Sequence, residues 1–162
     1  MNMACVRAGE VAAQSGLRKG RFMEMTMVEF LTWTNETSVG VETIDREHRE
    51  LAQAINELHG TMGKDDQQGL TRPLLRKVAE LTRAHFSSEE NMMTANKYPG
   101  AALHLFEHRN LMQQVDALQA RVSRGGFKLT EYSLAFMHDW FDTHIQKEDV
   151  QFGVWLNNTG KR

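Results

Sequence analysis

Residues 44–62 read IDREHRELAQAINELHGTM, and their apolar side chains recur at alternating intervals of four and three residues. This spacing predicts an amphipathic helix with one apolar stripe. The stripe consists of Ile44, Leu51, Ile55, Leu58 and Met62. His48 stands where the pattern calls for another apolar residue. The segment therefore predicts a helix that turns a histidine toward the interior, and it ends at the glycine-containing stretch 63–66.

A second and a third segment repeat the pattern. One helix is expected to begin near Pro73, because proline is tolerated in a first helical turn, and its stripe is Leu74, Val78, Leu81, His85, Ser88 or Glu89, and Met92. The next is expected between the breaks at residues 98–100 and 125–126, and its stripe is His104, His108, Leu111, Val115, Leu118 and Val122. Both stripes again contain histidine.

A fourth helix is expected after Thr130, a residue type that often caps a helix, and its stripe is Leu134, Met137, Phe141, His144 and Ile145. The 162 residues contain only two prolines and twelve glycines, a composition that favours long helices over sheets. Short connections make consecutive helices antiparallel. The predicted fold is all-α, an up-down-up-down antiparallel four-helix bundle.

The chain divides into three predicted parts. Residues 1–27 show no sustained periodicity and are expected to form a disordered extension. Met23, Met25 and Met27 leave open that translation begins later and that this extension is not made. The bundle domain is expected over residues 28–157, and residues 158–162 form a short tail.

The overall composition excludes several classes of protein. The net charge of −2 lacks the basic excess of a nucleic-acid-binding protein. No apolar run reaches the roughly 20 residues of a membrane span. The single cysteine, Cys5, cannot form an internal disulfide. We therefore expect a cytoplasmic protein.

Five histidines occupy inward positions of the four helices: His48, His85, His104, His108 and His144. A buried imidazole nitrogen without a partner costs about 1–3 kcal/mol. His104 and His108 lie four residues apart, so both side chains stand on the same helical face. His85 and Glu89 repeat that spacing. One metal centre would satisfy all these groups, whereas a purely structural bundle would need a separate explanation for each.

These motifs resemble the hemerythrin family, specifically single-domain bacterial hemerythrins, from Trp33 to about Phe152. A lone HxxxH is weak evidence, but five histidines and two carboxylates in this order across four helices are specific. The shared segments are SVGV at 38–41, IDREH at 44–48, HFSSEE at 85–90, Tyr98-Pro99, His104-x-x-x-His108, Trp140-x-x-x-His144-Ile145, and Asp149.

The resemblance implies two iron ions joined by an oxo or hydroxo bridge. One iron would be bound by His104, His108 and His144. His48 and His85 would bind the other, and the two bridging carboxylates would be Glu89 and Asp149. The second iron would have an open position, where the family binds dioxygen end-on as hydroperoxide. Imidazole and carboxylate would also accept zinc or manganese.

The second bridging carboxylate is ambiguous from spacing alone. On an ideal helix Asp149, five residues after His144, points to one side, and Glu148 would be favoured. The family resemblance favours Asp149. A local π-type widening of the helix near His144 would reconcile the two, since such turns often occur at functional sites.

For the residues near the expected ligands, the sequence indicates a role less clearly. Glu90 either faces outward or supports a ligand imidazole. Three aromatic residues flank ligands and are expected to be core or to form the wall of an oxygen pocket: Phe86, Trp140 and Phe141. We expect His59 and His138 to be ordinary surface or helix-end residues.

For function, the resemblance implies reversible dioxygen binding for storage, transport or delivery to an oxygen-consuming enzyme, by a monomer that is not itself an enzyme. The alternatives are a di-iron redox enzyme acting on peroxide, nitric oxide or ferrous iron, and an oxygen or redox sensor. The histidine-rich site favours oxygen binding, because ferritin-like oxidases use more glutamate ligands and fewer histidines.

Overall fold

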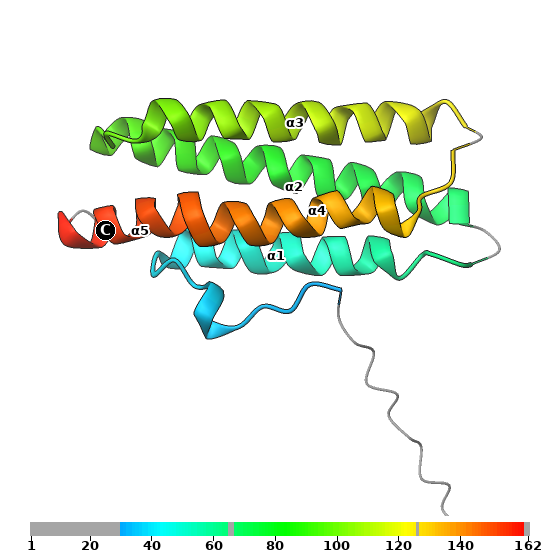
Figure 1. Ribbon diagram of the computed structural model, residues 1–162, viewed down its shortest axis with the longest axis horizontal. Coiled ribbons are helices and arrows are strands. Elements are labelled where there is room, and N and C mark those ends of the chain that lie inside the picture. Colours follow the sequence, from blue (N-terminus) through cyan, green and yellow to red (C-terminus); the bar gives the residue numbers. More distant parts are fainter. Residues whose placement is uncertain (1–29, 65–66, 126, 161–162) are drawn as a thin grey trace, which may run out of the picture.

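The computed structural model describes residues 30–64, 67–125 and 127–160, so the extension predicted over residues 1–27 lies outside the described residues. The described ranges form helices without strands, arranged lengthwise as a bundle (Figure 1). These are α1 (Glu42–His59), α2 (Gln67–Asn96), α3 (Ala101–Ser123), α4 (Glu131–His144) and α5 (Val150–Asn158). A π-helical segment, η2 (Ile145–Asp149), joins α4 to α5, so these three elements make up the fourth helix of the bundle. The predicted four-helix architecture is confirmed.

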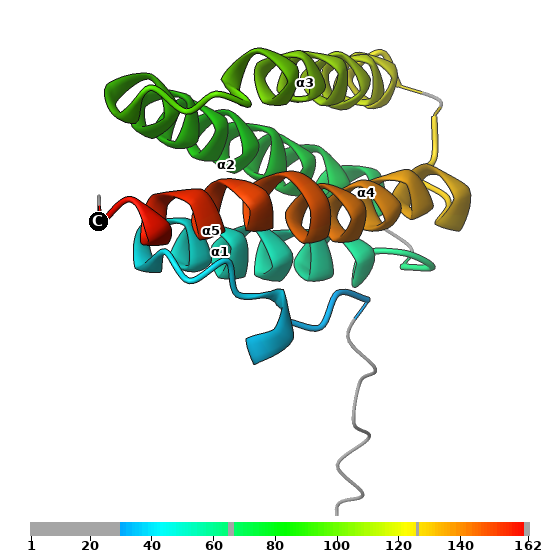
Figure 2. The ribbon, with the colours of Figure 1, turned by 60° about the vertical axis from the view of Figure 1, so that its left-hand side comes forward.

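Much of the core consists of the apolar stripes that the sequence spacing identified. In α1 the side chains of Ile44, Leu51, Ile55 and Leu58 are at most 1% exposed. In α2, however, the buried side chains include Leu75, Val78 and Met93, whereas Leu74, Leu81 and Met92 of the predicted stripe are only partly buried. Helix α2 packs between α1 and α3, and α4 runs beside α1, as the two views in Figure 1 and Figure 2 show. No helix within the described ranges combines the length and the apolar character that a membrane crossing requires.

The start of the second helix differs from the prediction. Helix α2 begins at Gln67, and Pro73 lies inside the helix instead of in its first turn. Proline has no N–H, so one helical hydrogen bond is missing there. The buried side chains of Leu75 and Val78 anchor the same part of the helix in the core. Tertiary packing therefore outweighs the local preference that suggested a later start.

The fourth helix begins where the sequence predicted. Thr130 is its N-cap, and its hydroxyl accepts a hydrogen bond from the backbone N–H of Ser133 at 3.2 Å. The Ser133 hydroxyl accepts one in return from the Thr130 N–H at 2.8 Å. This reciprocal capping box satisfies two backbone donors at the helix end.

An N-terminal strap, residues 30–41, precedes α1 and lies along the outside of the bundle (Figure 2). The Asn56 side chain pairs with both backbone groups of Leu31, each at 2.8 Å. The buried Asp45 carboxylate accepts hydrogen bonds from the Ser38 hydroxyl at 2.6 Å and from the Val39 N–H at 2.8 Å. These contacts attach both ends of the strap to α1.

The strap also contacts α5 at Gly153, where the two backbones meet. A Cβ atom on this glycine would lie 2.2 Å from the carbonyl oxygen of Val39. We expect Gly153→Ala to destabilise the protein by about 1–3 kcal/mol, because overpacking must displace backbone that Asp45 holds in place. Denaturant unfolding measures this loss. The control is Val154→Ala at a half-exposed neighbour, and equal stability of the two variants would contradict the prediction.

Candidate metal centre

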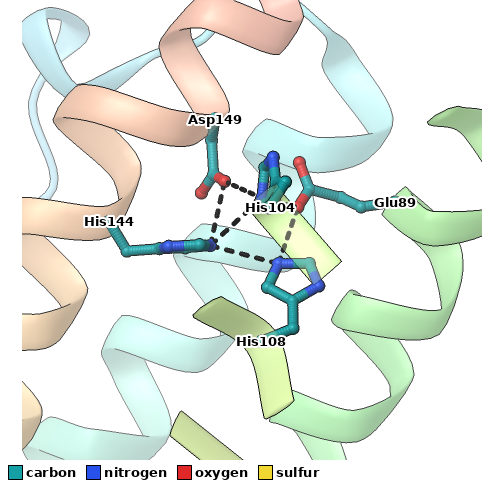
Figure 3. Close-up of side chains that lie close together, drawn as sticks. All are labelled: Glu89, His104, His108, His144 and Asp149. Atoms are coloured by element: carbon teal, nitrogen blue, oxygen red, sulfur yellow. Dashed lines mark hydrogen bonds and ion pairs between the residues drawn. The ribbon is translucent and has the colours of Figure 1, made fainter. Parts of the chain in front are cut away.

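Seven buried polar residues from all four helices of the bundle converge on one interior region. Each is at most 5% exposed. They are His48 of α1, His85 and Glu89 of α2, His104 and His108 of α3, His144 of α4, and Asp149 of η2. Figure 3 shows five of these side chains pointing toward one another. The structure thus brings together every residue that the sequence analysis singled out as a ligand.

The first group of potential ligands contains three histidines and both carboxylates: Glu89, His104, His108, His144 and Asp149. Each offers one donor atom, and these atoms all lie within 4.8 Å of one another. Asp149 Oδ1 is 3.0 Å from His104 Nε2 and 3.2 Å from His144 Nε2. Glu89 Oε2 is 3.4 Å from the Nε2 atoms of both His104 and His108.

The second group contains two histidines, His48 and His85, with Asp149. The Nε2 atoms of the two rings are 3.1 Å apart, and His48 Nε2 is 3.1 Å from Asp149 Oδ2. Asp149 therefore directs one oxygen to each group. Glu89 also reaches both, since its Oε2 is 3.7 Å from His85 Nε2. The two groups share their carboxylates but not their histidines.

The contacts inside this cluster do not satisfy its polar atoms. None of the four oxygens of Glu89 and Asp149 has a hydrogen-bond partner among the described residues. The Nε2 atoms of His108 and His144 face each other at 3.1 Å. Buried carboxylates without hydrogen bonds are strongly unfavourable. Converging nitrogen and oxygen lone pairs are instead the donor set that a transition-metal ion accepts, so the residues fit a metal centre.

The π-helical segment explains how Asp149 reaches the cluster. One extra residue per turn rotates the chain after His144. The Asp149 side chain is fully buried, whereas Glu148 is half-buried. Among the described residues, Glu148 belongs to neither group of potential ligands. The predicted widened turn near His144 is confirmed. It places Asp149, the residue that the family resemblance favoured, in the cluster.

Two glutamates outside the cluster orient two of its histidines. Glu47 Oε2 lies 3.1 Å from His85 Nδ1, and Glu90 Oε1 lies 3.1 Å from His108 Nδ1. Each contact holds the Nδ1 proton, which leaves the Nε2 lone pair facing the cluster. Glu90 therefore contacts an imidazole of the cluster, as one of its two predicted roles requires. The role of Glu47 was missed, because its partner lies on another helix and the only local signal is its position next to His48.

Aromatic rings cover the histidines from outside. Phe86 stacks on His108 with centroids 3.7 Å apart, and Trp140 lies 5.9 Å from His144. Phe141 is 6.2 Å from His48. All three flanking residues named in the sequence analysis thus contact a ring of the cluster, and they form an aromatic wall around it.

The two remaining histidines lie outside this cluster, as expected. His59, at the end of α1, stacks on Phe30 with centroids 4.5 Å apart, and His138 meets the same ring edge-on at 5.2 Å. Both histidines are partly exposed. They contribute to the anchoring of the strap.

The metal-free cluster has strongly shifted proton affinities. Burial alone would lower the pKa of His104, but the Asp149 and Glu89 carboxylates raise it to about 9. Burial likewise opposes protonation of His85, and its bond with Glu47 and the nearby carboxylates raise its pKa. For Asp149, burial works against ionisation, yet the surrounding histidines hold its pKa well below the usual value. In the metal-free cluster His104 therefore holds a proton that a metal ion would displace.

Metal uptake is therefore expected to be pH-dependent. Affinity for Zn²⁺ should rise between pH 6.5 and about 9, because His104 must lose its proton to become a ligand. The same proton stabilises the metal-free fold below pH 6.5, and this contribution is lost as the pH rises through about 9. Titration calorimetry in buffers of different ionisation enthalpy measures the released protons. Zinc binding without proton release at pH 7 would contradict the prediction.

Comparison with known proteins agrees with this geometry. Residues 39–156 match the family model of the hemerythrin HHE cation binding domain. The chain belongs to the hemerythrin family. The match runs from the strap through α5 and includes all seven residues of the cluster. Membership in this family, together with the cluster, implies a non-haem iron site.

Several named hemerythrins are similar over most of their length. The bacteriohemerythrin of Stenotrophomonas maltophilia (strain R551-3) is 25% identical, over 82% of this chain and 96% of the relative. That of Methylococcus capsulatus is 28% identical, over 78% and 97%. The myohemerythrin of Sipunculus nudus is 28% identical, over 74% and 88%. A crystal structure of a wild-type hemerythrin superposes with a TM-score of 0.73 at 28% identity, covering 76% of this chain and 95% of that one. The resemblance inferred from the motifs is confirmed.

Proposed function

We propose that this protein binds dioxygen reversibly at a pair of non-haem iron ions. The observation that carries the proposal is the unequal division of the histidines. Three imidazoles belong to one group and two to the other, while both groups share Glu89 and Asp149. Two metal ions held in this way differ by one ligand. The ion with fewer protein ligands keeps a position for a small molecule.

The ligand assignment follows from the two groups. His104, His108 and His144 would hold one iron, and His48 and His85 the other. Glu89 and Asp149 would bridge them, together with an oxo or hydroxo group. When bound, the iron pair supplies the electrons that dioxygen takes up and receives them back on release. The protein is then an oxygen carrier and not an enzyme.

The chain's own residues support reversibility by excluding water. Phe86, Phe141 and Trp140 surround the histidines, and the cluster itself is almost fully buried. An apolar enclosure limits side reactions with water and protons. Glu47 and Glu90 keep His85 and His108 in one orientation, so fewer groups rearrange when the oxidation state changes.

The compartment, oligomeric state and physiological role can also be inferred. We infer a cytoplasmic monomer that stores dioxygen, transports it or delivers it to an oxygen-consuming enzyme. The single cysteine, which cannot form an internal disulfide, supports the reducing compartment.

The test is an iron determination combined with absorption spectra of the anaerobically reduced protein before oxygen, after oxygen and after its removal. We expect about two irons per chain and a charge-transfer band that appears with oxygen and disappears on its removal. His48→Ala should remove the band, whereas His59→Ala, on the same helix but outside the cluster, should retain it. A stable diferric spectrum that does not reverse would instead favour a redox enzyme or a sensor.

A further inference from the structure

Trp140 is in direct contact with the three-histidine group of the metal centre. It lies one helical turn before His144, and the two rings are 5.9 Å apart with an interplanar angle of 26°. Its other neighbour is Phe86, which it meets edge-on at 5.8 Å. Phe86 in turn stacks on His108 at 3.7 Å and 9°. The indole is thus connected to the rings of His144 and, through Phe86, of His108. Trp140 is itself half-buried, so its ring also reaches the surface of the bundle.

Such an indole is well placed to lose electrons. Tryptophan is among the most easily oxidised side chains, and contact between ring systems favours electron transfer over short distances. The Nε1 atom of Trp140 is buried and has no hydrogen-bond partner among the described residues. The contacts of this ring within the described structure are therefore with the apolar core and with other rings.

We propose that Trp140 is the residue that becomes oxidised when the metal centre reacts with hydrogen peroxide. This inference rests on the proposed di-iron site. Peroxide takes up two electrons and two protons and leaves as two molecules of water. Trp140 supplies both electrons in successive one-electron steps and takes one oxygen atom from water, releasing two protons. The balance is Trp140 plus H₂O₂ giving oxygenated Trp140 plus H₂O, with the metal centre returned to its starting state.

The other tryptophans are less suited to this role. Trp33 lies 5.8 Å from His48, but the Arg49 guanidinium sits 5.9 Å from its ring centroid. A nearby cation disfavours the positive charge that oxidation creates. Trp155 is connected to the cluster through intervening rings, first Tyr98 at 5.2 Å and then Phe152, which lies 5.0 Å from Tyr98 and 6.5 Å from His104. Trp140 is in direct contact with a ring of the cluster, and among the described residues no cation lies over its indole.

The consequence is protection of the ligand set. Oxidation of an imidazole would remove a ligand and release metal, whereas oxygenation of Trp140 leaves the seven residues of the cluster intact. Tyr132, which is 90% exposed, serves as a reference residue for oxidation that starts from solution. An oxidising radical released into solution would reach Tyr132 before the half-buried Trp140, so the site of oxidation reports where the oxidant was formed.

The experiment treats the full-length protein, loaded with iron or with redox-inert zinc, with hydrogen peroxide. Peptide mass spectrometry then maps the oxidised residues, and electron paramagnetic resonance detects an organic radical whose hyperfine lines narrow with ring-deuterated tryptophan. We expect oxygenated Trp140 and this radical only in the iron form, with Tyr132 and Trp33 unmodified. In Trp140→Phe loaded with iron the radical should be lost, while Trp33→Phe should leave the radical and the iron spectrum unchanged.

Other outcomes overturn the proposal in distinguishable ways. Iron-dependent oxidation of Trp33, Tyr132 or the histidine ligands in place of Trp140 rejects the route, and an iron spectrum taken before peroxide is added shows that the di-iron site itself is present. Equal oxidation of Trp140 in the zinc form means that the metal has no part in it. A chain that binds no iron in the same preparation rejects the di-iron site and this inference with it. The oxidised residues are mapped on the unsubstituted chain, so this part of the test does not depend on whether a variant folds.

Discussion

Asp149→Ala is expected to leave the protein without stably bound iron, whereas Glu148→Ala should bind iron as the unsubstituted chain does. Asp149 is fully buried and directs one carboxylate oxygen to each histidine group, at 3.0 Å from His104 Nε2 and 3.1 Å from His48 Nε2. Its loss removes a ligand from both positions at once. Glu148 lies one residue earlier and is half-buried.

Iron content after gel filtration, with the absorption spectrum of the oxygenated form, measures the difference between the two variants. Circular dichroism on the same samples separates loss of metal from loss of the helices. The opposite pattern, with iron retained in Asp149→Ala and lost in Glu148→Ala, would assign the bridging role to Glu148.

Phe141→Ala is expected to lower the free energy of unfolding by about 3–5 kcal/mol and to accelerate autoxidation of the oxygenated form. The ring is 5% exposed and contacts His48. It also lines a cavity of about 240 Å³ between the strap and the fourth helix, together with Phe30, Leu31 and Ile145. Truncation joins this cavity to the two-histidine side of the cluster and admits water.

Denaturant unfolding and the decay of the oxygenated spectrum measure these two effects separately. Phe136→Ala is the control, because this half-buried ring is on the same helix but lines a groove beside α3. It should lower stability without changing autoxidation. An autoxidation rate that is the same in Phe141→Ala and in the unsubstituted chain would remove Phe141 from the wall of the oxygen site.

Much of this protein could be predicted from its sequence. Helical periodicity depends on residues three and four positions apart, so the stripe that begins at Ile44 and the capping residue Thr130 are visible along the chain. The histidines were recognisable for the same reason. Each interrupts an apolar stripe, and burial of an imidazole needs a partner. All five lie at most 5% exposed in one cluster.

Tertiary structure decided what local spacing leaves open. Glu47 meets His85 across two helices, and no interval along the chain encodes that contact. Packing of α2 on the core outweighed the preference of Pro73 for a first turn. At the cluster, the sequence determined which residue types face inward, because burial follows helical period. Only the π-helical segment, a departure from that period, decided that Asp149 and not Glu148 lies between the two histidine groups.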